Sequence, residues 1–145
     1  MCAETLTQTK TAANVEESVP FFGVTNMEAS LRFYMDGLGF EMPLKWVVDG
    51  RVRWCRLQHG GAGIMLQEFL KERVPSGKLG QGVSVSFACK DALAIYHQAK
   101  ARGIPTKAPM VGNGLWVTSL LDPDGYRIDF ASPTDAPEES EYVEP

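Results

Sequence analysis

The chain has 145 residues, which is enough for one compact domain and too few for two ordinary ones. Its 44% hydrophobic and 22% charged residues are typical of a soluble globular protein. Of the net charge of −4, residues 1–17 carry −2 and residues 133–145 carry −5, so residues 18–132 carry +3. This positive charge is scattered, which argues against a nucleic-acid partner and mildly favours a neutral or anionic ligand.

The sequence also bears on the compartment. No apolar run approaches the roughly 20 residues that a membrane-spanning helix needs, and the polar start lacks the pattern of a signal peptide. The three cysteines, Cys2, Cys55 and Cys89, form no CxxC pair, which argues against a disulfide framework and a thiolate metal site. We therefore expect a cytoplasmic protein with reduced thiols and no membrane contact.

The composition divides the chain into a domain and two tails. The first 17 residues are polar, and the last 13 are acidic and contain several prolines, so we expect both ends to be flexible. The predicted parts are a tail 1–17, one domain 18–132 with a first module 18–70, a linker 71–81 and a second module 82–132, and a tail 133–145. The linker is charged and rich in glycine, and the sequence leaves open whether it is a mobile flap or a plain connection.

The first module is expected to contain four strands and one helix. The helix follows the first strand and is capped by Asn26. The dipeptide Asp49-Gly50 predicts a tight hairpin between the next two strands. The predicted elements are the strand Val19–Val24, the helix Met27–Gly37 and the strands Phe40–Val48, Arg51–Gln58 and Gly63–Phe69.

The second module repeats this order, because the segment Val19–Phe40 is echoed by Val83–Ile104. Asp91 takes the place of Asn26 as helix cap. The turn Asp122-Pro123-Asp124-Gly125 separates the last two strands. The predicted elements are the strand Val83–Ala88, the helix Asp91–Arg102 and the strands Ile104–Pro109, Leu115–Leu121 and Tyr126–Ala131. Each module is β-α-β-β-β, and the fold class is α+β.

Two motifs connect this architecture to a known family. The sequence N-M-E-A-S-L-R-F-Y begins at Asn26, and L-D-P-D-G-Y-R-I-D-F ends at Phe130. A doubled β-α-β-β-β unit with these motifs resembles the vicinal oxygen chelate superfamily of glyoxalases, extradiol dioxygenases and bleomycin-resistance proteins. The resemblance implies two modules that form a curved mixed-sheet cup. It also implies a homodimer, because related chains commonly complete their cups between subunits.

The resemblance also says where a metal would bind. Metal-dependent members use His, Gln or Glu at four strand positions, and matching the motifs places these at Val19 (or Pro20), Met65, Ser84 and Asp129. A divalent metal needs three or four donors of the His, Cys or carboxylate type, and only Asp129 is one. His59 and His97 are expected away from the site. We therefore predict no metal and no cofactor.

Strand periodicity predicts which side chains face the cup. In the first module Met65 shares its face with Gly63, Gln67 and Phe69, and antiparallel pairing sets Arg56 opposite Met65 and Trp54 opposite Gln67. In the second module Asp129 shares its face with Arg127 and Ala131. Pairing across the turn adds Trp116, Thr118 and Leu120, and the first strand adds Ser84 and Ser86. Glu68 and Arg53 fall on the otherwise apolar opposite face and have no explanation from the sequence.

These residues predict a small-molecule pocket. The indoles of Trp54 and Trp116 would stack on a planar ligand, and Arg56 would bind an anionic or carbonyl oxygen. Asp129 would accept hydrogen bonds, or act as a catalytic base if burial raised its pKa. The sequence leaves open that the tryptophans are core residues and that Arg56 and Arg127 face solvent.

Three functions remain open at this stage. The first is a metal-free protein that binds a small, partly aromatic, neutral or anionic molecule, in the manner of bleomycin-resistance proteins. The second is a lyase, isomerase or dioxygenase-type enzyme that uses Asp129, or a metal if the ligand register is wrong. The third is a protein that acts through contacts with another macromolecule.

Overall fold

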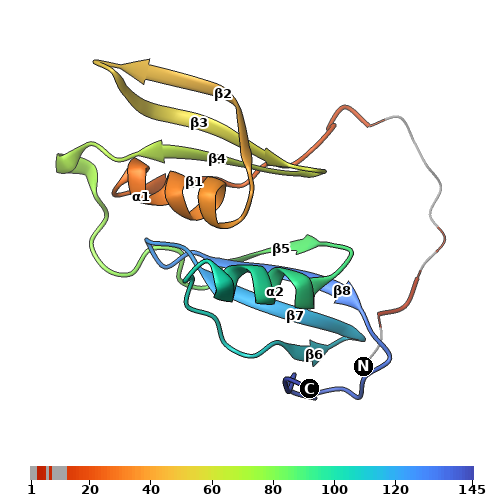
Figure 1. The fold of residues 1–145 in the computed structure, drawn as a ribbon. Coiled ribbons are helices and arrows are strands. Elements are labelled where there is room, and N and C mark those ends of the chain that lie inside the picture. The colour runs from red at the N-terminus through yellow and green to blue at the C-terminus, as the bar shows by residue number, and fades with distance from the viewer. Residues whose placement is uncertain (1–2, 6, 8–12) are drawn as a thin grey trace.

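The computed structural model describes residues 3–5, 7 and 13–145 (Figure 1). Residues 1–2, 6 and 8–12 of the predicted N-terminal tail lie outside the described residues. Two modules follow one another along the chain, and each forms its own four-stranded mixed sheet with a helix on one side (Figure 1). The predicted α+β fold of two β-α-β-β-β modules is therefore confirmed.

The first sheet has the strand order β1-β4-β3-β2, in which β1 and β4 are parallel and the other pairs antiparallel. Residues Asp49 and Gly50 both have positive φ, 50° and 74°, and form the predicted tight turn between β2 and β3. The elements are β1 Phe21–Val24, α1 Met27–Leu31, the π-helical η1 Arg32–Gly37, β2 Glu41–Val48, β3 Arg51–His59, β4 Ala62–Glu68 and the short 3₁₀ turn η2 Lys71–Arg73.

The second sheet repeats this arrangement in the order β5-β8-β7-β6, with β5 parallel to β8. Its elements are β5 Ser84–Ala88, α2 Ala92–Ala101, β6 Met110–Gly112, β7 Leu115–Leu121 and β8 Arg127–Pro133.

Both helices begin at the predicted caps. The Asn26 side chain accepts a hydrogen bond from the backbone N–H of Ala29 at 3.1 Å, and Asp91 accepts one from Ala94 at 3.0 Å. Each bond satisfies a backbone donor that a helix start leaves without an internal partner. The first helix is not uniform, however, because it widens into a π-helix at Arg32.

The predicted strand Ile104–Pro109 is wrong. Pro105 and Pro109 lack backbone donors, and the N–H of Ile104 is used to close the end of α2 by bonding to the carbonyl of Ala99 at 2.9 Å. The strand lies instead at Met110–Gly112, where the sequence predicted a loop. Asn113 and Gly114 form a tight turn with positive φ of 54° and 72° that pairs β6 with β7.

The acidic segment after β8, expected as a flexible tail, lies along the outer edge of β6. The N–H of Glu139 donates to the carbonyl of Val111 at 3.0 Å, and the N–H of Val111 donates to the carbonyl of Ser140 at 2.9 Å. The N–H of Tyr142 donates to the carbonyl of Pro109 at 2.8 Å. The Tyr142 ring contacts Trp116 edge to face, with ring centres 5.9 Å apart. This segment is therefore integrated with the second module.

The two modules meet through their helix-bearing sides. The Tyr34 hydroxyl of η1 donates to the Asp122 carboxylate at 2.8 Å, and Arg102 donates to the carbonyl of Gly37 at 2.7 Å. The Phe22 ring stacks on Tyr126 at 4.2 Å between ring centres. Phe22 and Tyr34 belong to the continuous apolar core, and Tyr126 packs against it. Helix α1 thus lies between its own sheet and the second module (Figure 1).

Asp122 is the polar centre of this contact and is only 5% exposed. Besides the Tyr34 hydroxyl, its carboxylate accepts the N–H groups of Asp124 and Tyr126, both at 2.9 Å. Burial raises the pKa of Asp122, although these hydrogen bonds oppose the rise. Burial also raises the pKa of the Tyr34 phenol, which therefore remains a donor at neutral pH.

Within the described part of the chain, no helix has both the length and the apolar character that crossing a bilayer would need.

Replacing Tyr34 by Phe should reduce the free energy of unfolding at pH 7.5 by about 1–3 kcal/mol, because the buried Asp122 carboxylate loses one of its three hydrogen-bond donors. In the wild type the hydrogen bond from Tyr34 lowers the pKa of Asp122, so this pKa should be higher in the variant. A carboxyl pKa raised by folding costs stability as the pH rises from the unfolded pKa to the folded pKa, and the full cost remains above the folded pKa, so the loss in the variant should become smaller as the pH falls. Urea unfolding at several pH values measures both effects.

Tyr142→Phe is the matched control, because the hydrogen bond of the Tyr142 hydroxyl is a long one, 3.4 Å, to the exposed His97 ring. Its effect should stay within about 0.5 kcal/mol at every pH. Equal losses in the two variants would contradict the assigned role of the Tyr34–Asp122 bond.

Candidate functional site

The first sheet has one face covered by α1 and one open face. Because residues paired across strands point to the same side, the register defines two rows on the open face. Arg56 pairs with Met65 and Trp54 pairs with Gln67, as predicted from the sequence. The two rows are Phe21, Met65, Arg56 and Leu44, and Gly23, Gln67, Trp54 and Trp46.

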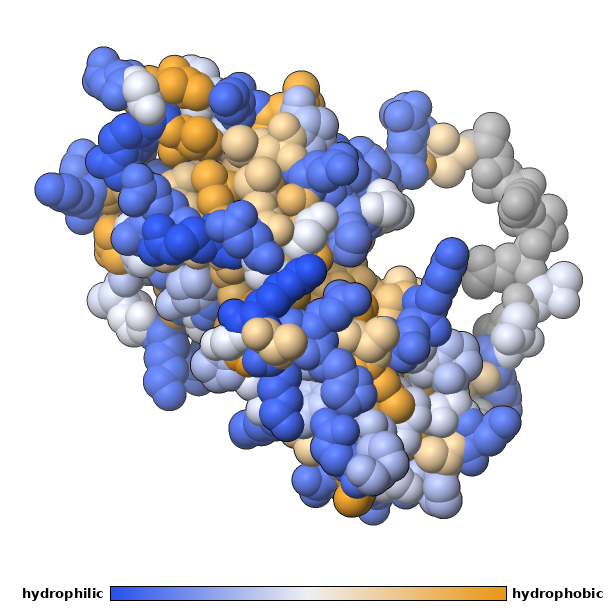
Figure 2. Space-filling model, in the orientation of Figure 1, coloured by the Kyte–Doolittle hydropathy of each residue, from blue (hydrophilic) through white to orange (hydrophobic). Residues whose placement is uncertain are grey.

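Sequence reasoning missed the contribution of β2 to this face. A regular hairpin around Asp49-Gly50 would pair Trp46 with Arg53 and turn its indole toward the helix. The structure has an irregularity between Trp46 and Val47 that shifts the register by one, so Trp46 pairs with Trp54. Leu44 and Trp46 are both 56% exposed on this open face, and Figure 2 shows exposed apolar side chains over this sheet.

An open pocket of about 830 Å³ lies at one end of this sheet. It combines aromatic side chains from the open face with arginines from β3 and from the linker. The Phe69 ring covers Gly23 so closely that a Cβ there would lie 2.1 Å from the ring, so only glycine admits this packing. The lining residues are Phe21, Gly23, Trp46, Val48, Asp49, Arg51, Arg53, Gln67, Glu68, Phe69, Leu70 and Arg73.

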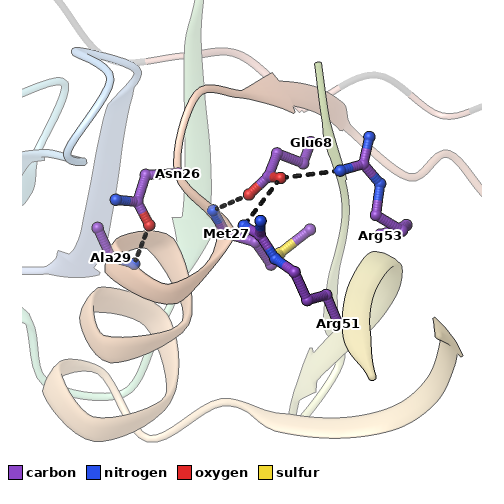
Figure 3. Close-up of polar contacts among 6 residues, drawn as sticks. All are labelled: Asn26, Met27, Ala29, Arg51, Arg53 and Glu68. Atoms are coloured by element: carbon purple, nitrogen blue, oxygen red, sulfur yellow. Dashed lines mark hydrogen bonds and ion pairs between the residues drawn. The ribbon is translucent and has the colours of Figure 1, made fainter. Parts of the chain in front are cut away.

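Glu68 and Arg53, unexplained by the sequence, form a polar cluster at the edge of the pocket (Figure 3). One oxygen of the buried Glu68 carboxylate accepts the N–H of Met27, the first residue of α1, at 2.8 Å. Its other oxygen accepts hydrogen bonds from Arg53 at 3.1 Å and Arg51 at 3.3 Å. Glu68 therefore connects the start of α1 to β3, which is why a charged residue stands on the helix-covered face.

Arg56 lies on the open face and is less free than expected. It pairs with Glu17 of the N-terminal segment at 3.1 Å and also donates to Gln58 at 3.3 Å. Glu17 is largely exposed, so this ion pair is weak in water and a ligand can compete for the guanidinium.

In the second sheet the predicted register across the turn is wrong by one residue. Leu121 pairs with Arg127 rather than Tyr126, because the N–H of Tyr126 bonds to Asp122 and its ring leaves the sheet to stack on Phe22. Trp116, Thr118 and Leu120 consequently lie on the helix-covered face, opposite the predicted side. Thr118 is fully buried and donates to the carbonyl of Ala92 at 2.6 Å.

The open face of the second sheet carries a group of polar side chains, beside the exposed Leu121 that pairs with Arg127. Ser84 pairs with Arg127, and Ser86 and Ser119 flank Asp129. Arg127 donates to the Asp129 carboxylate at 3.0 Å and to the Ser119 hydroxyl at 3.2 Å. The structure thus brings Ser84, Arg127 and Asp129 together, and the catalytic role of Asp129 remains a prediction.

The two open faces do not meet within one chain. The side-chain and ring contacts in the core between the modules involve Phe22, Tyr34 and Phe40 on the helix side of the first module. At the end of β1, Thr25 and the carbonyl of Gly23 add hydrogen bonds to Asp124 and Tyr126. The open face of the first sheet therefore points away from the second module (Figure 1). Trp54, Arg56, Met65 and Gln67 form one group, and Ser84, Arg127 and Asp129 form another.

The positions that hold a metal in the resembled family do not suit one here. Val19, Met65 and Ser84 offer no strong donor, and the Asp129 carboxylate is bound to a guanidinium. Among the residues that the structure describes, no group of three or more His, Cys, Asp or Glu side chains is placed to bind a metal ion.

Comparison with known proteins identifies the family. The model of the Glyoxalase/Bleomycin resistance protein/Dioxygenase superfamily matches residues 18–130. The chain belongs to this superfamily. No curated protein matches the chain.

Several solved structures share the fold. TnmS3, an antibiotic binding protein from Streptomyces sp. CB03234, has a TM-score of 0.66 at 20% identity over 85% of this chain and 100% of its own. A superfamily member from Sphaerobacter thermophilus DSM 20745 has a TM-score of 0.60 at 25% sequence identity. The match covers 81% of this chain and 98% of that one. A glyoxylase/bleomycin resistance protein/dioxygenase domain from Frankia sp. EAN1pec has a TM-score of 0.67 at 15% sequence identity. The match covers 86% of this chain and 96% of that one.

Replacing Glu68 by Ala should lower the free energy of unfolding by about 2–3 kcal/mol, because Met27 N–H and Arg53 lose a charged acceptor. Glu68→Gln keeps an oxygen for Met27 and should cost about half as much. Chemical denaturation of both variants measures the difference. Glu72→Ala, at an exposed position in the nearby turn η2, is the control and should change stability by less than about 0.5 kcal/mol. A Glu68→Ala variant as stable as this control would show that the cluster is not structural.

Proposed function

We propose that this protein binds a small, partly aromatic, neutral or anionic molecule on the open face of the first sheet, without a metal. The observation that carries the proposal is the exposed indole of Trp46 beside Trp54, at the mouth of an open pocket of about 830 Å³. Aromatic side chains exposed on a rigid sheet provide stacking surfaces for a planar ligand.

The charges around the pocket support the preference for neutral or anionic ligands. Three arginines line it, Arg51, Arg53 and Arg73, against the two carboxylates of Asp49 and Glu68. Arg56, on the same sheet face, adds a further cation when a ligand displaces the exposed Glu17 carboxylate that pairs with it. A cationic ligand would meet this excess of positive charge and be disfavoured.

A second copy of the chain completes the site in this proposal. Each chain has an aromatic open face on its first sheet and a polar open face on its second, and the two point in different directions. The first of these faces exposes Phe21, Leu44 and Trp46, which favours its burial against a partner. A homodimer that pairs the first sheet of one chain with the second sheet of the other would close two identical cups.

The relatives support the same class of function. TnmS3 is an antibiotic binding protein with this fold. By analogy, the ligand of the present protein would be a small molecule that is sequestered rather than converted.

Tryptophan fluorescence tests ligand binding against a panel of aromatic compounds. A binding compound should quench the emission of the wild type, and Trp46→Ala should weaken its binding by about 0.5–1.5 kcal/mol, up to roughly tenfold in Kd, because a stacking surface is lost.

Trp116→Phe is the control, because Trp116 lies on the helix-covered face of the other sheet. It should retain both the quenching and the affinity of the wild type. An intact fold that responds to no compound in the panel would contradict the proposal.

Light scattering tests the dimer. The protein at micromolar concentration should have twice the 15.9 kDa mass of the chain. Leu44→Asp should shift it toward the monomer, because a charge would be buried at the sheet-to-sheet contact. Val143→Asp, at an apolar position that is 80% exposed near the C-terminus, should remain dimeric. A monomeric wild type would refute the dimer.

A further inference from the structure

We infer that the pocket at the end of the first sheet binds a planar aromatic molecule that bears one acidic oxygen group. The acid binds Arg51 and Arg73, and the ring lies against Trp46 and Phe69. This inference rests on the proposed function and adds the chemical class of the ligand.

Arg73 supplies the first cation. It ends the 3₁₀ turn Lys71–Arg73, where its backbone N–H donates to the carbonyl of Leu70 at 2.9 Å. Its side chain lines the pocket, and its guanidinium has no hydrogen bond or ion pair to the rest of the described chain. Five N–H donors are therefore available to a ligand.

Arg51 supplies the second cation. Its side chain is 67% exposed and makes one contact to Glu68 at 3.3 Å. Arg53 is 23% exposed and contacts the same oxygen at 3.1 Å, so it is the closer and less exposed partner of this carboxylate (Figure 3). One carboxylate thus serves two guanidiniums and the N–H of Met27, which leaves most of the donors of Arg51 unused.

The apolar wall decides between a small inorganic anion and an aromatic acid. Phe21, Trp46, Phe69 and Leu70 line the same pocket as Arg51 and Arg73. An inorganic anion would leave these apolar side chains exposed to water and most of the 830 Å³ pocket unfilled. A planar acid covers the wall with its ring and places its oxygens on the arginines, where a carboxylate or sulfonate accepts paired hydrogen bonds.

Asp49 limits the charge of the ligand. Its carboxylate also lines the pocket, in the turn that immediately precedes Arg51. A polyanion would be repelled by Asp49 and Glu68, whereas a single acid group is balanced by Arg51 and Arg73.

Two fluorescent probes that differ only in their acid group test the inference. These are 8-anilinonaphthalene-1-sulfonate and its neutral analogue N-phenyl-1-naphthylamine, titrated into the full-length protein and into Arg51→Gln, Arg73→Gln and Arg32→Gln. Arg32→Gln is the matched control, because Arg32 is exposed on η1 and lies outside the pocket. This substitution changes the net charge by the same amount as the other two.

The sulfonate should bind Arg51→Gln and Arg73→Gln about tenfold more weakly than the wild type, because each variant loses a charge-assisted hydrogen bond. The neutral analogue should bind all four proteins within about twofold of one another, and Arg32→Gln should behave as the wild type. The sulfonate should also be displaced by 2-naphthoate or 2-naphthyl phosphate but not by 2-naphthamide, and the better competitor identifies the acid group.

Two results would overturn the inference in different ways. If both probes bind with quenching of Trp46 and the arginine variants do not discriminate between them, the acid subsite is wrong and the proposed function stands. If neither these probes nor the compounds of the fluorescence panel bind to the folded wild type, the proposed function fails together with the subsite.

Discussion

The buried carboxylate of Asp122 determines how the two modules are joined. It lies in the turn before β8, and it binds the Tyr34 hydroxyl of the other module together with two N–H groups of its own turn. Because the same carboxylate shapes the turn and binds the first module, the ring of Tyr126 is placed on Phe22. The D-P-D-G-Y motif is therefore a docking element as well as a connection between strands.

This docking decides where ligands have access. Since the helix sides of the modules are used for the internal contact, both sheets keep a face that the chain itself does not cover. The aromatic face exposes Trp46, whereas the polar face places Asp129 in an ion pair with Arg127. The core shared by the two modules fixes the orientation of these two faces within one chain, so each chain presents them in different directions.

The sequence predicted the parts of the fold that depend on local signals. The caps Asn26 and Asp91 and the turn Asp49-Gly50 act over a few residues, and the structure has them where expected. The errors in strand register arose where one residue leaves the regular pattern. Tyr126 leaves the sheet to reach the other module, so Trp116 and Thr118 lie on the covered face instead of the predicted open one. The irregularity at Trp46 places its indole on the open face. Contacts between distant segments, such as Glu68 with Met27, have no local signature in the sequence.

The chain's own C-terminal segment lies along the outer strand of the second sheet, where Val111 exchanges backbone hydrogen bonds with Glu139 and Ser140. An uncovered outer strand is a template for uncontrolled association with other chains. The C-terminal segment therefore occupies the hydrogen-bonding edge of β6, whereas β2, the outer strand of the first sheet, has two register irregularities that interrupt a regular hydrogen-bonding edge. The edge strands β6 and β2 are thus protected in two different ways: a further segment of the chain pairs with β6, and register irregularities interrupt the edge of β2.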